Sequence, residues 1–231
     1  IYAAAVGTPG IFAVNTVIKG NVFSGLNPLV ESVAVNNCFY TRPIMGILAQ
    51  NLRFMSIGSG SAAADINYFE DFENTSSSTC GNPLFPRGIY AFNSNITVRN
   101  SVFRNIDRVD GGRGIDFICS PGQVFRLDVN GLGKTGSPTF SNVGIGIRGH
   151  GNISATNAKF EQLIYGVEIA DNSGPYTINL SDNSYSNIEE HAVFANQFSP
   201  ITGFNVKNST FDDNNNYIGI TGFARAGVYL Q

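Results

Sequence analysis

Three charged residues stand at the same place in short, similar segments, and they are the first candidates for chemistry. The segments are Gly114-Ile115-Asp116, Gly146-Ile147-Arg148 and Gly166-Val167-Glu168. If each is a β-strand whose isoleucine or valine points inward, the next side chain points outward, because successive residues face opposite sides. Stacked strands would align these side chains about 4.8 Å apart. A line of carboxylate, guanidinium and carboxylate groups could bind the acidic groups or hydroxyls of a sugar.

Aromatic residues extend this line. Related segments place Tyr90, Phe194 and Thr221 at the same position, where aromatic faces could support sugar rings. The predicted glycan-binding residues are Tyr90, Asp116, Arg148, Glu168 and Phe194. The candidates for catalysis are Asp116, Arg148, His150 and Glu168, since His150 follows Arg148 by two residues. A purely structural interpretation is also open, because opposite charges on neighbouring strands contribute about 0.2–1 kcal/mol per pair without any ligand.

The composition of the 231 residues limits the class of protein. Charged residues make up 13% and hydrophobic residues 42%, so the chain is not disordered by the charge criterion. The net charge is −3 and the lysines and arginines form no cluster, which argues against nucleic acid as a partner. No apolar run approaches the length of about 18 residues that a membrane-spanning helix needs. Cys38, Cys80 and Cys119 lack metal-ligand spacing. The sequence allows either one disulfide with a remaining thiol or three thiols.

A second pattern precedes the glycine-containing segments. It consists of an apolar-x-apolar strand, a polar residue and an aromatic residue three positions later, as in Ile96-Thr97-Val98-Arg99-Asn100 followed by Phe103. Its other copies end at Phe23, Phe39, Phe160, Tyr185 and Phe211. The polar residue predicts a bend, because asparagine tolerates left-handed backbone geometry. The residues predicted to stack there as a ladder of amides are Asn36, Asn100, Asn157 and Asn208, with Asp182 as a variant.

The glycine-containing segments recur at uneven intervals. Their apolar residues fall at positions 47, 89, 115, 147, 167, 193 and 220. Loops of unequal length must therefore separate the strands, and residues 58–87 and 130–138 are predicted to be the longest of them. Strands this short cannot bury a face alone, whereas stacked units bury one continuous core.

Together these patterns predict an all-β fold: a single-stranded right-handed parallel β-helix, or solenoid, of three short sheets with an asparagine ladder. The repeat resembles that of parallel β-helices of the pectate-lyase-like superfamily over about residues 12–230. This resemblance implies that the Gly-Ile strand forms the first sheet, the strand before the asparagine the second, and the aromatic strand the third. One domain is predicted over residues 1–231. Neither end reads as a cap, so the chain is expected to be a segment of a longer protein with domains or partners at its ends.

The segment Gly149-His150-Gly151 resembles a motif of the polygalacturonases in that superfamily, and Gly114-Ile115-Asp116 resembles one of their strands. The rest of the pattern departs from theirs. Gly111-Gly112-Arg113 stands where Asn-Thr-Asp would be, and the paired aspartates and an Arg-Ile-Lys segment are missing. Asp116 and Glu168 would lie two strands apart, about 10 Å, whereas inverting hydrolases hold their carboxyl groups about 6.5–9.5 Å apart. Polygalacturonase activity is therefore not predicted.

A polysaccharide lyase would need a base beside a uronate and often Ca²⁺ to neutralise its carboxylate. Arg148 could serve as that base or neutralise the substrate, with Asp116 and Glu168 as orienting groups. No metal site or cofactor is predicted. Calcium in the oxygen-rich segment 212–216 is an alternative to the simpler interpretation of that segment as a solvated turn.

Two classes of function follow. The preferred one is a non-catalytic, secreted or cell-surface β-helical segment that acts as a stalk, an adhesin or a surface contacting polysaccharide or other glycans. The alternative is a carbohydrate-active enzyme, a polysaccharide lyase or glycoside hydrolase acting on an acidic polysaccharide, with its site on the outer face of the first sheet. The incomplete catalytic set favours the first class, and the long loops that could wall a site favour the second.

Overall fold

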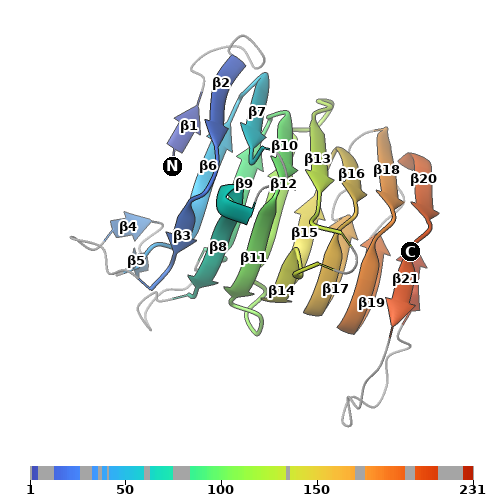
Figure 1. The fold of residues 1–231 in the computed structure, drawn as a ribbon. Helices are drawn as coiled ribbons and strands as arrows, with labels where there is room; N and C mark the ends of the chain where they lie inside the picture. The colour runs from blue at the N-terminus through green and yellow to red at the C-terminus, as the bar shows by residue number, and fades with distance from the viewer. Residues whose placement is uncertain are drawn as a thin grey trace.

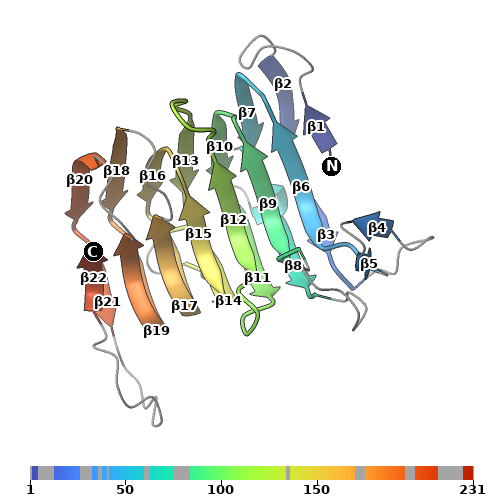
Figure 2. The same cartoon turned by 180° about the vertical axis from the view of Figure 1, so that it is seen from behind.

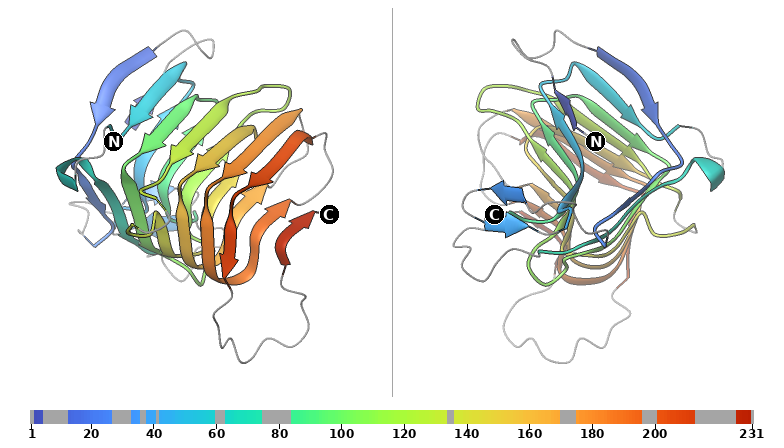
Figure 3. Two further views of the ribbon diagram at one scale, coloured as in Figure 1. Left: turned by 45° about the vertical axis from the view of Figure 1, so that its right-hand side comes forward. Right: turned by 90° about the vertical axis from the view of Figure 1, so that its left-hand side faces the viewer.

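The computed structural model describes residues 2–4, 13–26, 33–35, 38–40, 42–59, 63–74, 84–133, 136–169, 175–195, 201–212 and 226–230. Nearly all of their regular structure is β-strand, and one short 3₁₀ helix, η1, covers Ala63–Asp65. Successive turns of the chain lie beside one another from one end of the molecule to the other (Figures 1 and 2). Seen nearly along this direction, the turns surround a common interior (Figure 3, right). The architecture is a parallel β-solenoid.

Three series of strands run along the solenoid. The first series contains β1 (Tyr2–Ala4), β6 (Met45–Gln50), β9 (Arg87–Phe92), β12 (Arg113–Ile118), β15 (Ile145–Gly149) and β22 (Ala226–Leu230). The second contains β2 (Ala13–Ile18), β7 (Phe54–Ile57), β10 (Ile96–Arg99), β13 (Arg126–Asn130), β16 (Asn152–Thr156), β18 (Tyr176–Ser181) and β20 (Ile201–Lys207). The third contains β3 (Val22–Ser24), β8 (Asn67–Phe72), β11 (Ser101–Ile106), β14 (Phe140–Val143) and β21 (Thr210–Asp212). The long strands β17 (Lys159–Ile169) and β19 (Ser184–Ala195) run through the third series and continue into the first.

The interior is built from layers that repeat from turn to turn. At one register position of the first series every side chain points inward and is 0% exposed, at Ile47, Ile89, Ile115, Ile147, Val167 and Val193. In the third series seven aromatic rings form a continuous column, here called the ring stack: Phe23, Phe69, Phe103, Phe140, Phe160, Tyr185 and Phe211. Neighbouring ring centroids lie 4.7–5.1 Å apart, and the rings are nearly parallel. The strand spacing of a parallel sheet imposes this distance, and it matches the separation at which aromatic rings attract one another.

The glycines of the Gly-Ile segments make room for the ring stack. A Cβ atom placed on Gly114 would lie 2.7 Å from Cδ1 of Phe140 and 2.6 Å from the carbonyl oxygen of Gly146. Gly88 and Gly146 meet the rings of Phe103 and Phe160 in the same way. The glycine that recurs in the sequence is therefore required by the aromatic residue of another strand series.

Polar residues in the left-handed conformation form the corners of the coil. The predicted bend residues Asn100, Asn157, Asp182 and Asn208 all have positive φ, between 45° and 58°. Asn36 lies outside the described residues. A direct chain of side-chain hydrogen bonds runs along a different corner, within the third series. There Asn105 Nδ2 donates to Asp71 Oδ1 at 2.9 Å, and Asn142 Nδ2 donates to Asn105 Oδ1 at 3.0 Å.

Two predictions about the first third of the chain were wrong. The copy of the repeat assigned to Val33–Phe39 is a hairpin, because β4 (Val33–Val35) pairs antiparallel with β5 (Cys38–Tyr40). The range 58–87 is not one loop, since it holds η1 and strand β8, whose Phe69 and Phe72 are buried in the core. The polar pair Glu70-Asp71 in the middle of β8 hid this strand in the sequence.

Candidate functional site

The predicted line of outward residues exists in the first series, and its register is regular. Asp116 pairs with Tyr90 on one side and with Arg148 on the other, and Arg148 pairs with Glu168. Phe194 follows Glu168, so the five predicted glycan-binding residues lie in consecutive strands. We call Tyr90, Asp116, Arg148, Glu168 and Phe194 the outer column. The next place belongs to Tyr229, whereas Thr221, which was expected there, lies outside the described residues.

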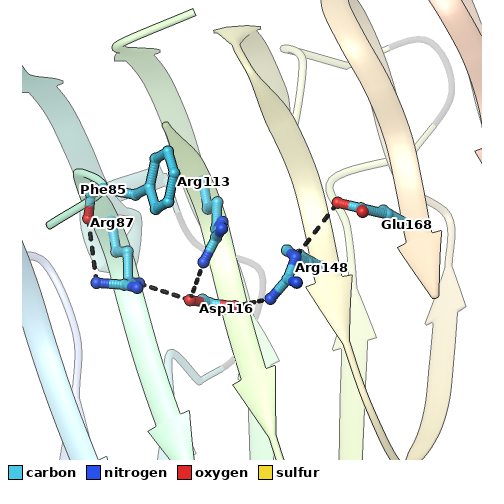
Figure 4. Close-up of polar contacts among 6 residues, drawn as sticks. All are labelled: Phe85, Arg87, Arg113, Asp116, Arg148 and Glu168. Atoms are coloured by element: carbon cyan, nitrogen blue, oxygen red, sulfur yellow. Dashed lines mark hydrogen bonds and ion pairs between the residues drawn. The ribbon is translucent and has the colours of Figure 1, made fainter. Parts of the chain in front are cut away.

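Asp116 does not face solvent as the sequence suggested. Its side chain is 0% exposed, although it points away from the apolar core. Oδ2 accepts a hydrogen bond of 2.6 Å from Arg87 Nε and another of 2.6 Å from Arg113 Nη1 (Figure 4). Oδ1 lies 3.6 Å from Arg148 Nη1. Burying a carboxylate is costly unless it is paired and hydrogen-bonded, and three guanidinium groups meet that need here.

Two of these arginines were missed in the sequence. Arg87 and Arg113 immediately precede the glycine of their segments, and their register pairs them with each other. Strict alternation would place Arg113 on the face of the strand that Asp116 does not occupy. Arg113 and Asp116 nevertheless form an ion pair, three positions apart in the sequence. The alternation is broken at Gly114, which lies against the ring stack. The residues before these glycines, and His191 before Ala192, are in register with one another and form a second column: Met45, Arg87, Arg113, Ile145, Tyr165 and His191.

Aromatic side chains hold the two arginines in place. The Arg113 guanidinium lies 4.4 Å from the ring centroid of Phe85, and that of Arg87 lies 4.8 Å from the ring centroid of Tyr90. Arg87 Nη1 also donates to the carbonyl oxygen of Phe85 at 3.1 Å (Figure 4). Burial lowers the pKa of Arg113, and Asp116 opposes this effect. Both guanidinium groups are thus fixed by the protein itself.

Arg148 is held less tightly. It lies between two carboxylates, with Nη1 3.6 Å from Asp116 Oδ1 and Nε 3.4 Å from Glu168 Oε2 (Figure 4). Its side chain is 23% exposed, about twice the exposure of Arg87 or Arg113. Burial raises the pKa of Glu168, while the charges of Arg148 and Arg113 lower it. The three arginines and two acids of this cluster sum to one positive charge.

Three aromatic rings lie beside Glu168 and form what we call the ring platform: Tyr165, His191 and Phe194. The ring centroid of Phe194 lies 5.4 Å from that of Tyr165 and 5.4 Å from that of His191. Tyr165 and His191 are 6.1 Å apart, and all three side chains are half-buried. Burial raises the pKa of Tyr165. Of these three residues, the sequence had singled out only Phe194 for the glycan face.

The remaining candidates add little to this face. His150 follows Arg148 by two residues and is half-buried, and its backbone N–H donates to the carbonyl oxygen of Phe117 at 2.8 Å. Among the described residues no three His, Cys, Asp or Glu side chains are grouped so that they could hold a metal ion. Of the segment 212–216 only Asp212 is described. Cys119 is a buried thiol whose pKa is raised to about 11 by that burial, so it is not a nucleophile.

A cavity of about 390 Å³ lies at a different place, beside the corner that carries the chain of amides. Its walls include Asn105, Asn142, Asp107 and Arg108. Burial raises the pKa of Asp107, whose carboxylate accepts hydrogen bonds from the backbone N–H groups of Asn74 and Asp110. None of the outer column residues lines this cavity.

In the part of the chain that the structure describes, no helix has the length and apolarity needed to cross a membrane. Comparisons with protein-family models, with curated proteins and with solved structures found no match to this chain. The chemistry of its own surface is therefore the basis on which a function can be assigned.

Proposed function

We propose that this chain is a non-catalytic, glycan-contacting segment of a secreted or cell-surface protein, and that the outer column, apart from the buried Asp116, contacts an acidic polysaccharide. The observation that supports this most directly is the position of Arg148. It lies between two carboxylates and is partly exposed, and the rings of Tyr165 and Phe194 belong to the next strand and the one after it. A guanidinium group is well suited to carboxylate or sulfate because its donors match their paired oxygens.

The same geometry speaks against catalysis. An inverting or retaining glycosidase needs two carboxyl groups that reach the scissile bond. Asp116 is 0% exposed, its Oδ2 accepts hydrogen bonds from Arg87 and Arg113, and its Oδ1 lies 3.6 Å from Arg148, so it cannot contact a sugar without breaking the network. Of the two acids in the arginine cluster, Glu168 is then the one whose carboxyl group is partly exposed.

One observation favours the alternative, an enzyme acting on an acidic polysaccharide. Burial raises the pKa of Glu168, and a raised pKa is a common property of a general acid. A lyase with Arg148 as the base and Glu168 as an acid would fit this face, with His150 nearby.

We further propose the finer form of the solenoid, a right-handed coil of three sheets like that of the pectate-lyase-like superfamily. Its support is the repeat of three strand series, the glycine column and the left-handed asparagine corners. A crystal structure would test it, since a left-handed coil would contradict it.

The function is tested by incubating the protein with pectate, alginate and sulfated galactan. New reducing ends and the absorbance of unsaturated products measure turnover, and affinity electrophoresis in gels containing the same polysaccharides measures binding. We expect retardation without turnover, and we expect Arg148→Ala to abolish the retardation. The matched control is Arg126→Ala, which removes an exposed arginine from the second series. Turnover that disappears in Arg148→Ala would establish the enzyme instead.

A further inference from the structure

Resting on the proposed function, the structure points to one binding position for a single acidic sugar residue. We propose that the sugar ring packs on the ring platform of Tyr165, His191 and Phe194, and that its carboxylate or sulfate binds Arg148 in place of Glu168. The ligand class is thus a uronic acid or a sulfated sugar within a glycan.

The ring platform has the shape for a sugar ring. Its three rings come from two neighbouring strands, β17 and β19, and they contact one another through Phe194. Tyr165 and Phe194 are inclined by 30°, His191 and Phe194 by 26°, and Tyr165 and His191 by 49°, so the three half-buried rings form a tilted cluster whose exposed parts offer apolar contact to a ligand. Contacts with aromatic faces stabilise such packing by burying apolar C–H groups.

Arg148 is the arginine best able to receive the acidic group. Arg87 and Arg113 each make a hydrogen bond of 2.6 Å to Asp116, whereas both ion pairs of Arg148 are 3.4 Å or longer. A charge-assisted hydrogen bond from a guanidinium is typically about 2.7–2.9 Å long, so Arg148 leaves this interaction unfulfilled. In the register Arg148 lies two strand spacings, about 10 Å, from Phe194, with Glu168 between them, and the arginine side chain together with an acidic group on a sugar ring can span this separation.

Glu168 is the group that the ligand displaces. It lies between the platform and Arg148, paired with Arg148 on one strand and with Phe194 on the other. The charged or titratable groups around it in the described part of the chain are Arg148, Arg113, Asp116 and Tyr165, with Glu190 and His191 beside Tyr165. With Glu168 ionised the arginine cluster carries one net positive charge, and with Glu168 neutral it carries two. An anionic ligand therefore competes with Glu168 for Arg148.

The test measures the dissociation constants of trigalacturonate, its neutral methyl ester and a sulfated galactan oligomer by isothermal titration calorimetry. We expect the methyl ester to bind at least tenfold more weakly than the acid. Arg148→Ala should weaken the acidic ligands by about 10- to 100-fold, the loss typical of one hydrogen bond to a charged group. Phe194→Ala should weaken them about 3- to 10-fold, as expected for one aromatic contact. Thermal unfolding of each variant confirms that it is folded, and Arg126→Ala is the matched control.

The variant Glu168→Gln tests whether the ligand displaces Glu168 from Arg148, because it removes the negative charge and keeps the size of the side chain. We expect it to tighten binding of both acidic ligands severalfold. Binding of the sulfated oligomer by the natural protein should tighten as the pH is lowered toward the raised pKa of Glu168, and Glu168→Gln should flatten this dependence. His191→Phe, which keeps an aromatic ring in the ring platform, is the control that the dependence comes from Glu168.

The possible failures are distinguishable. If Arg148→Ala abolishes binding of acidic polysaccharide but Glu168→Gln weakens it or leaves it unchanged, the proposed displacement is wrong and the proposed function stands. The same holds if Phe194→Ala has no effect or if the methyl ester binds as tightly as the acid. If no acidic glycan binds, both proposals are wrong.

Discussion

The ring stack inside the solenoid and the outer column on its first series both place one residue on each successive strand, but they use opposite kinds of residue. Inside, seven successive positions carry a phenylalanine or a tyrosine, at nearly constant spacing. Outside, consecutive positions carry a tyrosine, an aspartate, an arginine, a glutamate and a phenylalanine. Identical apolar rings attract one another at 4.8 Å, whereas identical charges at this spacing repel.

The contrast shows where the repeat is a structural requirement and where it leaves freedom. Any residue of the ring stack contacts copies of itself, so its replacement leaves a void in a close-packed column. A residue of the outer column contacts unlike partners, and its role depends on them. The departure from repetition at Asp116, Arg148 and Glu168 is therefore the feature that needs an explanation beyond the fold.

The largest expected effect comes from breaking the ring stack at its middle. Phe140→Ala should lower the free energy of unfolding by about 4 kcal/mol, because a ring that is 0% exposed leaves a cavity between two neighbours. Urea unfolding followed by circular dichroism measures this loss. The control is Phe54→Ala on the second series, where the side chain is 43% exposed and the loss should be much smaller. Equal losses would show that the stack is not the main source of stability.

The next largest effect concerns the buried part of the outer face. Asp116→Asn should cost about 3 kcal/mol, since it leaves Arg87 and Arg113 beside a neutral group in a buried position. Asp128→Asn removes one partner of the exposed pair Arg126–Asp128 and should cost about 0–1 kcal/mol. The same unfolding measurement compares them. A loss below about 1 kcal/mol for Asp116→Asn would mean that the arginines find other partners or water.

A smaller effect tests the link between the two regions. Gly114→Ala should cost about 1–3 kcal/mol, because its methyl group would press on Phe140 and on the carbonyl oxygen of Gly146. Combining it with Phe140→Leu should recover part of this loss, because the smaller side chain frees space near the added methyl group. A double-mutant cycle measures the coupling. Strict additivity would show that the glycine column does not serve the ring stack.

The smallest effect is a pH dependence at Glu168. Its pKa is raised in the folded protein, so its contribution to stability is fully present below the unfolded value of about 4.3 and is lost as the pH rises through the folded value. Glu168→Gln should therefore gain stability relative to the natural protein between pH 4.5 and pH 7. The control is Glu161→Gln on the same strand, where Glu161 pairs with Lys159 at 3.1 Å. A gain of the same size in the control would contradict the assignment to Glu168.

The solenoid, the inward Ile and Val column, the order of the outer column and the left-handed bends at Asn100 and Asn157 were all predictable from the sequence. These are local properties: alternation within a strand, the tolerance of asparagine for positive φ, and an aromatic residue three positions after a bend. They repeat often enough to be recognised without any knowledge of contacts. The hairpin at Val33–Tyr40 was mispredicted because its residues match the repeat pattern by chance. The strand Asn67–Phe72 was not predicted because two polar residues interrupt its apolar pattern.

The burial and the partners of the outer residues follow from three-dimensional contacts that the sequence pattern does not contain. Asp116 is an outward residue in the sequence pattern and a fully buried one in the protein, because Arg87 and Arg113 reach over it from positions where alternation predicts the opposite face. Those arginines precede Gly88 and Gly114, where the alternation is broken and each glycine lies against a ring of another series. The ring platform likewise joins Tyr165 to His191 and Phe194 across two strands. The burial and the ion pairs of these side chains depend on residues one turn of the coil away. Such residues are far apart in the sequence, so a local sequence pattern does not reveal their contacts.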